Sequence, residues 1–166
     1  MIVRSLERLF AIFLIAVLLF VVPTYYQYQR QEEMNYQLVL LETEKAADLV
    51  CELGYIEEHS LAKLQAVLAA TGTNYQIRLS HLKKEFLENE GEGKIEAYYV
   101  GSYNTEIYQG IRSEGKYRMN LGDFFYISVE NTSQTPFQQL KSFLGVGGQR
   151  VSIIARGGGL IRAEGL

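Results

Sequence analysis

The feature that most constrains this chain is an apolar run near its N-terminus, where residues 9–22 read LFAIFLIAVLLFVV without one polar side chain. In hydrocarbon such a segment is stable as a helix, because each backbone N–H and C=O must find its partner within the segment. Crossing a membrane takes about 20 residues, so we predict a transmembrane span from about Leu6 to about Tyr26. Tyr25, Tyr26 and Tyr28 are expected to form its aromatic belt.

Charges on the two sides of this span predict its orientation. Arg4 and Arg8 precede it, whereas Glu32 and Glu33 follow it, and basic flanks favour the cytoplasmic side. We therefore expect a single-pass protein of the cell membrane with a cytoplasmic N-terminus and an extracytoplasmic remainder. A cleaved secretory signal peptide is the alternative, but the residues after the run offer no small-residue cleavage site of the A-x-A type.

The helix that begins in the span has no clear stop signal before Gly54, a residue type that favours a left-handed helix cap. The span is therefore predicted to continue into an amphipathic stalk. We divide the chain into a transmembrane anchor with a short cytoplasmic N-terminus (1–28), a stalk helix (29–54) and an extracytoplasmic head domain (55–166). The chain is 48% hydrophobic, with 12 Tyr, 8 Phe and only 2 Pro, which indicates an ordered head with one modest core.

Beyond the stalk, the spacing of apolar residues predicts an α+β head with one short antiparallel sheet and two or three short helices. Residues 88–93 are expected to form a charged loop, and Gly157–Gly159 a tight turn or bulge between two strands. The expected helices cover residues 57–70, 105–111 with Thr105 as cap, and 136–144 with Thr135 as cap. The expected strands cover residues 74–86, 125–130, 150–156 and 160–164. Residues 95–103 are expected to form either a further strand or an irregular connection.

Residues that could carry chemistry are few. The chain has two histidines, His59 and His81, whose spacing matches no metal motif. It also lacks a nucleophile elbow and a phosphate-binding loop, so we predict a protein that is not an enzyme and binds no cofactor. Asp123 follows Gly122 and is expected to stabilise a turn. A hydrolase remains an alternative only if His59 or His81 meets Asp123 and a serine in a pocket.

The stalk is acidic, and the C-terminal part of the chain is comparatively basic. For each acidic residue a solvated helix face is the simpler interpretation, and the other is that Glu42, Asp48 and their neighbours meet a basic surface of another subunit. No basic cluster is dense enough to indicate nucleic acid binding. Cys51 lies among apolar stalk residues and is expected to be buried.

An apolar N-terminal helix with Glu7 near its cytoplasmic end and Pro23 further along, continuing into a small α+β head, resembles the type IV pilin architecture. The segments TEKAADLVCELGYIEEHSLAKLQAVLAATGTNYQIRLSHLKKE, YRMNLGDFFYISVENTSQTPFQQLKSFLG and IIARGGGLIRAEG are similar to minor pilin-like proteins of tight-adherence (Tad-type) pilus systems in Gram-positive bacteria. In type IV pilins a peptidase removes a short leader after a Gly, and the first ten residues here contain no Gly. Processing and an uncleaved anchor both remain open.

This resemblance implies a minor pilin-like subunit that contributes to an extracytoplasmic pilus or secretion apparatus. Its partners would be the lipid bilayer, other pilin-like subunits and pilus-assembly proteins. Glu7 and Arg8 would set its position at the cytoplasmic face, and Ala11, Ala16 and Pro23 would allow close helix packing and bending. The alternative is a tethered binding domain that does not polymerise, with a surface formed by tyrosines of the head, namely Tyr98, Tyr99, Tyr103 and Tyr108.

Overall fold

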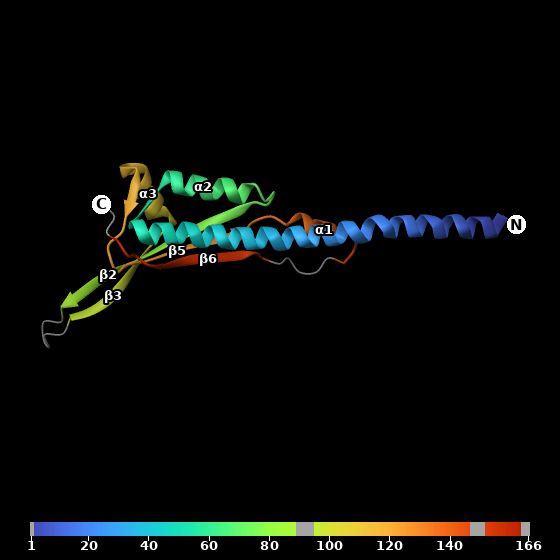
Figure 1. Ribbon diagram of the computed structural model, residues 1–166. Coiled ribbons are helices and arrows are strands. Elements are labelled where there is room, and N and C mark those ends of the chain that lie inside the picture. The colour runs from blue at the N-terminus through green and yellow to red at the C-terminus, as the bar shows by residue number, and fades with distance from the viewer. Residues whose placement is uncertain (1, 89–94, 147–151, 164–166) are drawn as a thin grey trace. The chain divides into compact units, whose positions relative to one another are not determined.

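The computed structural model describes residues 2–88, 95–146 and 152–163, and its contacts divide the chain into two compact units (Figure 1). The first, the anchor unit, comprises Met1–Asn35 and Gln134–Arg150, and the second, the head unit, comprises Tyr36–Ser133 and Val151–Leu166. Both units include part of helix α1 (Ile2–Leu53). The layout is α+β, with a long N-terminal apolar helix followed by a small head of antiparallel sheets and helices.

Helix α1 confirms the predicted continuation from the apolar run into the stalk. It ends at Leu53, and Gly54 follows with φ 73°, a left-handed conformation that glycine adopts without a Cβ clash. Pro23 lies inside the helix and can donate no backbone hydrogen bond. Next to it, the Thr24 hydroxyl donates to the carbonyl of Phe20 at 2.7 Å, so a side chain supplies an extra hydrogen bond at this turn.

The described part of the head contains two sheets rather than the single sheet predicted. The larger one has the strand order β3-β2-β5-β6 with every pair antiparallel, and the smaller one pairs β1 with β4. Strands β1 and β4 have three residues each, too few to show an alternating sequence pattern. The strands are β1 (Tyr55–Glu57), β2 (Tyr75–Glu88), β3 (Ile95–Tyr103), β4 (Lys116–Arg118), β5 (Phe124–Asn131) and β6 (Ile154–Leu160).

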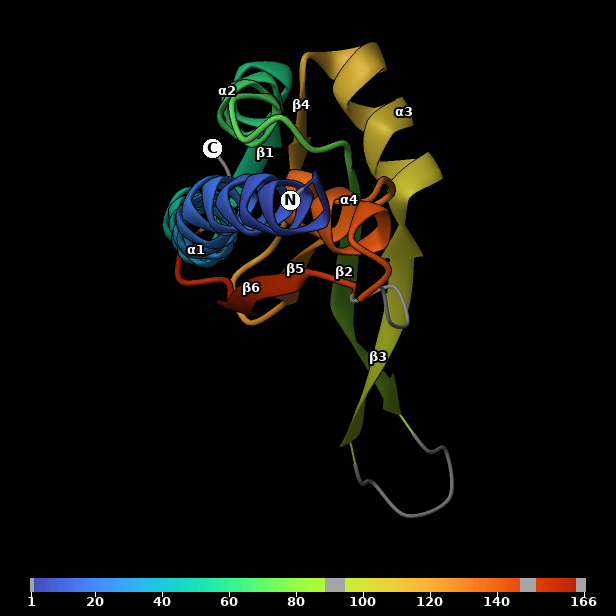
Figure 2. The same ribbon diagram turned by 90° about the vertical axis from the view of Figure 1, so that its right-hand side faces the viewer.

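Alternating residues of β2 and β5 form the core side of the larger sheet. Phe125, Ile127 and Val129 are each at most 1% exposed, and they share a core with Val39 and Val50 of α1. Strands β2 and β3 extend as a hairpin beyond the other strands, on the side away from α2 and α3 (Figures 1 and 2). The loop predicted at 88–93 lies outside the described residues, apart from residue 88 at the end of β2.

Within the described residues, three short helices follow α1, which agrees with the predicted two or three: α2 (Glu58–Ala69), α3 (Asn104–Glu114) and α4 (Pro136–Phe143). The cap at Thr135 is confirmed, because its hydroxyl accepts a hydrogen bond from the Gln138 N–H at 3.2 Å. The cap predicted at Thr105 is wrong. The N-cap of α3 is Tyr103, and Asn104 instead uses its side-chain oxygen to accept a hydrogen bond from the Leu79 N–H at 2.5 Å.

The C-terminal segment differs most from the prediction. The glycines at 157–159 form no turn, because a single strand, β6, runs through them and pairs with β5 over its whole length. A Cβ atom on Gly157 would lie 2.9 Å from the Glu44 Cα and from the Thr43 carbonyl oxygen. Glycine is therefore present because α1 packs directly on the backbone of β6.

Candidate functional site

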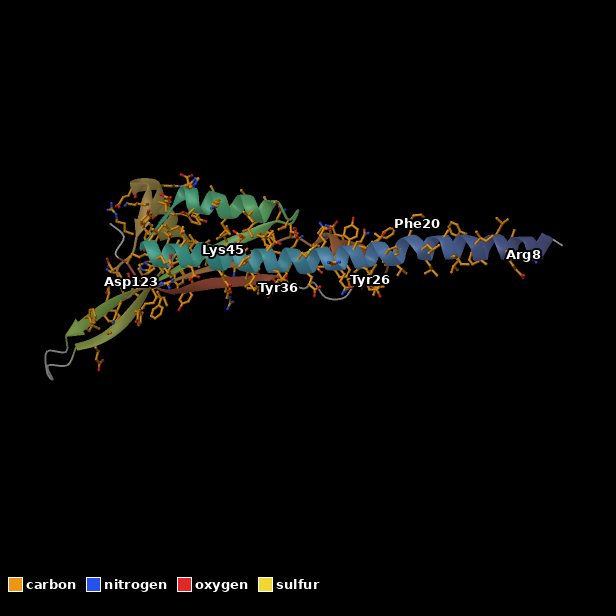
Figure 3. All side chains as sticks on the ribbon, in the orientation of Figure 1. Arg8, Phe20, Tyr26, Tyr36, Lys45 and Asp123 are labelled. Atoms are coloured by element: carbon orange, nitrogen blue, oxygen red, sulfur yellow. The ribbon has the colours of Figure 1, made fainter. Side chains whose placement is uncertain are left out.

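The anchor unit presents an apolar helix that the protein itself leaves uncovered. Among the described residues, one helix, Leu6–Leu53 within α1, is long and apolar enough to cross a membrane, and its 18-residue apolar window has a mean hydropathy of 2.4 with no residue buried. Figure 3 shows Arg8, Phe20 and Tyr26 in this order along the helix. Such a surface is compatible with a single-pass membrane anchor.

The residues proposed for packing within the membrane lie on two faces of α1. A helix turns by about 100° per residue, so Glu7 and Ala11 are within about 40° of each other, and so are Ala16 and Pro23. The two pairs lie on nearly opposite sides of the helix. All four side chains, and that of Arg8, are exposed, and each face could meet a different neighbouring helix.

Three acidic residues of the stalk, Glu42, Asp48 and Glu52, have basic partners within their own chain. Glu42 pairs with Lys45 at 2.8 Å, and Asp48 pairs with Arg162 at 3.4 Å. Arg162 also lies 3.9 Å from Glu52. Exposed ion pairs of this kind contribute little to stability, but they reduce the charge that α1 presents to a second subunit. A basic surface of another subunit would have to compete with these contacts.

Glu42 and Asp48 also lie on different sides of α1 within the head unit. Glu42 lines a groove between α1 and α2, with a volume of about 390 Å³, which includes His59 and Lys63. Asp48 lines a larger recess of about 790 Å³, whose lining also includes the arginines of β2 and β6, Arg78 and Arg156. The structure therefore does not bring the two predicted assembly acids together.

A buried hydrogen-bond network joins β2, β4 and the turn before β5. The His81 Nε2 lies 2.9 Å from an Asp123 carboxylate oxygen, and its Nδ1 lies 2.8 Å from the Tyr117 hydroxyl. The carboxylate also accepts hydrogen bonds from the backbone N–H groups of Lys84 at 2.8 Å and Asn120 at 2.9 Å. Asp123 thus stabilises a turn as predicted, and in addition links this turn to β2.

The proton positions follow from the partners. Because a carboxylate can only accept, Nε2 of His81 donates to Asp123, and in the neutral imidazole Nδ1 accepts from the Tyr117 hydroxyl. Burial raises the pKa of Tyr117, and a hydrogen bond with Ser102 opposes this shift only in part. The phenol therefore keeps its proton at neutral pH and can serve as the donor that Nδ1 requires.

This network meets only part of the condition set for a hydrolase. His81 and Asp123 are in contact, but their side chains are only 4% and 2% exposed, and Tyr117 occupies the imidazole nitrogen that a nucleophilic serine would use. Ser102, the cross-strand partner of His81, has a side-chain hydrogen bond with Tyr117. The geometry therefore fits a structural link between strands better than a catalytic triad. No local sequence pattern indicates this link, since 42 residues separate His81 from Asp123.

Two further expectations concern single residues. Cys51 is buried as predicted, at 1% exposed, and burial raises the pKa of its thiol. Its sulfur lies 3.6 Å from the Gly159 carbonyl oxygen. His59 is exposed at the start of α2. Over the described part of the chain, no group of three or more His, Cys, Asp or Glu residues could hold a metal ion.

The second face of the larger sheet carries aromatic side chains where polar ones are the rule. This outer face, opposite the core residues of β5, includes Tyr99, Tyr103, Phe124 and Tyr126. The Phe124 ring lies 5.4 Å from that of Tyr99 and 6.3 Å from that of Tyr126. The three tyrosines are 40–62% exposed.

Of the tyrosines proposed as a binding surface, the structure places Tyr99 and Tyr103 together on this outer face. Tyr98 lies on the opposite face of β3, where its hydroxyl donates to Glu85 at 2.7 Å, and Tyr108 is half-buried in α3. Tyr126, which borders the recess with Arg78 and Arg156, was not among the predicted binding residues. Its alternation with Phe125 and Ile127 was the signal that could have indicated it.

Comparisons with known proteins give no further guide to identity. No family model, curated protein or solved structure matches this chain.

Proposed function

We propose that this chain is a membrane-anchored, extracytoplasmic subunit of a larger assembly, a minor pilin-like component of a pilus or secretion apparatus with its N-terminus in the cytoplasm. The observation that supports it most is the continuity of α1. A single helix carries the uncovered apolar surface and, after it, the residues that complete the head core, Val39, Ala47, Val50 and Cys51. Sister helices could therefore pack in the membrane, since each anchor shares this one helix with its own head.

Cysteine crosslinking within the membrane tests this proposal. In a variant whose own cysteine is removed (Cys51→Ala), single cysteines at Ala11 and Ala16 sample the two opposite faces of the anchor. We expect oxidation to crosslink at least one of them to a neighbouring helix, since small residues allow close approach. Val17→Cys, at an exposed position about 100° or more from both Ala11 and Ala16 around the helix, is the matched control. Equal and weak crosslinking at all three positions would contradict specific packing.

A second function is favoured by the outer face of the sheet, whose aromatic side chains adjoin the recess with Arg78 and Arg156. Exposed aromatic patches of this kind mark binding surfaces, so the alternative is a tethered binding domain that does not polymerise.

An exchange of the span separates the two functions. Replacing residues 6–22 with an unrelated apolar sequence should abolish helix-specific crosslinking if the chain is an assembly subunit. A photoactivatable side chain at Tyr103 should keep its crosslinked product after the exchange if the head binds a ligand by itself. The same probe at Tyr98, on the opposite face of β3, is the control. Loss of the Tyr103 product after the exchange would exclude independent binding by the head.

A further inference from the structure

Helix α4 is held against α1 at two points of the anchor unit. The Thr135 hydroxyl donates to a carboxylate oxygen of Glu32, and the Phe137 ring packs edge-on against that of Tyr25, with ring centroids 5.1 Å apart. Figure 2 shows α4 beside α1. Tyr25 is seven residues closer than Glu32 to the N-terminus, which is about 10 Å along the helix axis. The start of α4 therefore runs toward the apolar, N-terminal end of α1.

The apolar side of α4 is only partly covered by this contact. Phe137 is 8% exposed, whereas Leu140 and Leu144 are half-buried. Phe143 is 87% exposed, more than any other large apolar side chain in the described residues, including those of the apolar run. Val146, just beyond the helix, is 62% exposed. An exposed phenylalanine of this kind is costly in water.

The position of α4 along α1 indicates what covers Phe143. The predicted membrane span ends near Tyr26, so the contact between Tyr25 and Phe137 lies at the level of the headgroups. Residues 136–146 contain no acidic side chain, and Lys141 places its ammonium 5.5 Å from the centroid of the Phe137 ring. Apolar side chains beside a cation, at the end of a membrane span, suit the interface of a bilayer that contains anionic lipid.

We propose that α4 is a second membrane contact, in which Phe143 and Val146 insert into the lipid interface beside the anchor while Lys141 faces the headgroups. The inference depends on the membrane anchor of the proposed function but not on assembly. The contact would hold α1 at one depth and one rotation in the bilayer, because Thr135 and Phe137 fix α4 to one side of the helix. It would thereby determine which face of α1 each neighbouring subunit meets.

Single tryptophans test this placement, because the chain contains no Trp. Phe143→Trp reports on α4, Phe13→Trp on the span and Phe86→Trp on an exposed site of β2. Each full-length variant is reconstituted at low density into vesicles of phosphatidylcholine and phosphatidylglycerol. We expect Phe143→Trp and Phe13→Trp to show blue-shifted emission, quenching by lipids with brominated acyl chains and loss of quenching by aqueous iodide, and Phe86→Trp to show the reverse. Val146→Trp should behave as Phe143→Trp.

The outcomes separate the two proposals. If Phe13→Trp is quenched by brominated lipid but Phe143→Trp is quenched by iodide as strongly as Phe86→Trp, the anchor stands and the contact of α4 with lipid is wrong. If Phe143→Trp is protected from iodide without quenching by brominated lipid, protein covers it and the proposal is also wrong. If Phe13→Trp itself is not quenched by brominated lipid, the membrane anchor fails.

Discussion

Replacing Asp123 with alanine is expected to lower the free energy of unfolding of the head by about 3 kcal/mol or more, because each buried donor left without a partner costs about 1–3 kcal/mol. The substitution leaves three donors facing a cavity: His81 Nε2 and the backbone N–H groups of Lys84 and Asn120. None of them gains water easily, because the Asp123 side chain is only 2% exposed. Chemical unfolding of the reconstituted chain, followed by the near-ultraviolet circular dichroism of its tyrosines, measures the loss.

Two further variants show which part of the network carries this effect. Asp123→Asn keeps an oxygen that can accept from the Lys84 N–H, but it replaces the other oxygen with an NH₂ group. This group faces the Asn120 N–H, which is also a donor. The loss of stability should therefore be intermediate. Glu85→Ala removes an exposed carboxylate of β2, the strand that carries His81, and should change the stability of the head little. If Asp123→Ala proves as stable as Glu85→Ala, the network does not hold the head together, and a chemical role for the buried pair would have to be considered again.

The parts of the fold that were predicted correctly depend on local signals. The end of α1 is marked by Gly54, the start of α4 by Thr135 and Pro136, and the buried side of β5 by its alternation. These features follow from backbone conformation and from the side-chain period, which a few adjacent residues determine.

The features that were not predicted depend on contacts between distant segments. Asn104 is the first residue of α3, and its side-chain oxygen accepts a hydrogen bond from the Leu79 N–H of β2. His81 and Asp123 meet because β2 pairs with β5, and the spacing of the two residues in the sequence contains no trace of this. At the candidate site, the sequence indicated the apolar run but not the contact of α4 with α1, for which Thr135 and Glu32 are 103 residues apart.

The three glycines of β6 offer a direct test of the contact between α1 and the sheet. Gly158 has φ +152°, and a Cβ there would lie 2.2 Å from the Phe125 carbonyl oxygen, so Gly158→Ala is expected to cost about 3 kcal/mol or more through backbone strain and overlap. At Gly157 the backbone is ordinary, but a Cβ would overlap Glu44 and Thr43 of α1. We expect about 1–3 kcal/mol for Gly157→Ala, as for other overpacked sites.

Gly159→Ala is the matched control, because a Cβ at this position meets nothing within 4 Å and the backbone needs no special conformation. Its expected change lies between zero and a gain of about 1 kcal/mol, since alanine restricts the unfolded chain more than glycine does. The same unfolding measurement ranks the three variants. If Gly157→Ala is tolerated as well as Gly159→Ala, α1 does not rest on the backbone of β6. The glycine run would then be explained by its contact with β5 alone, and residues 43–44 of α1 would not be held against this strand.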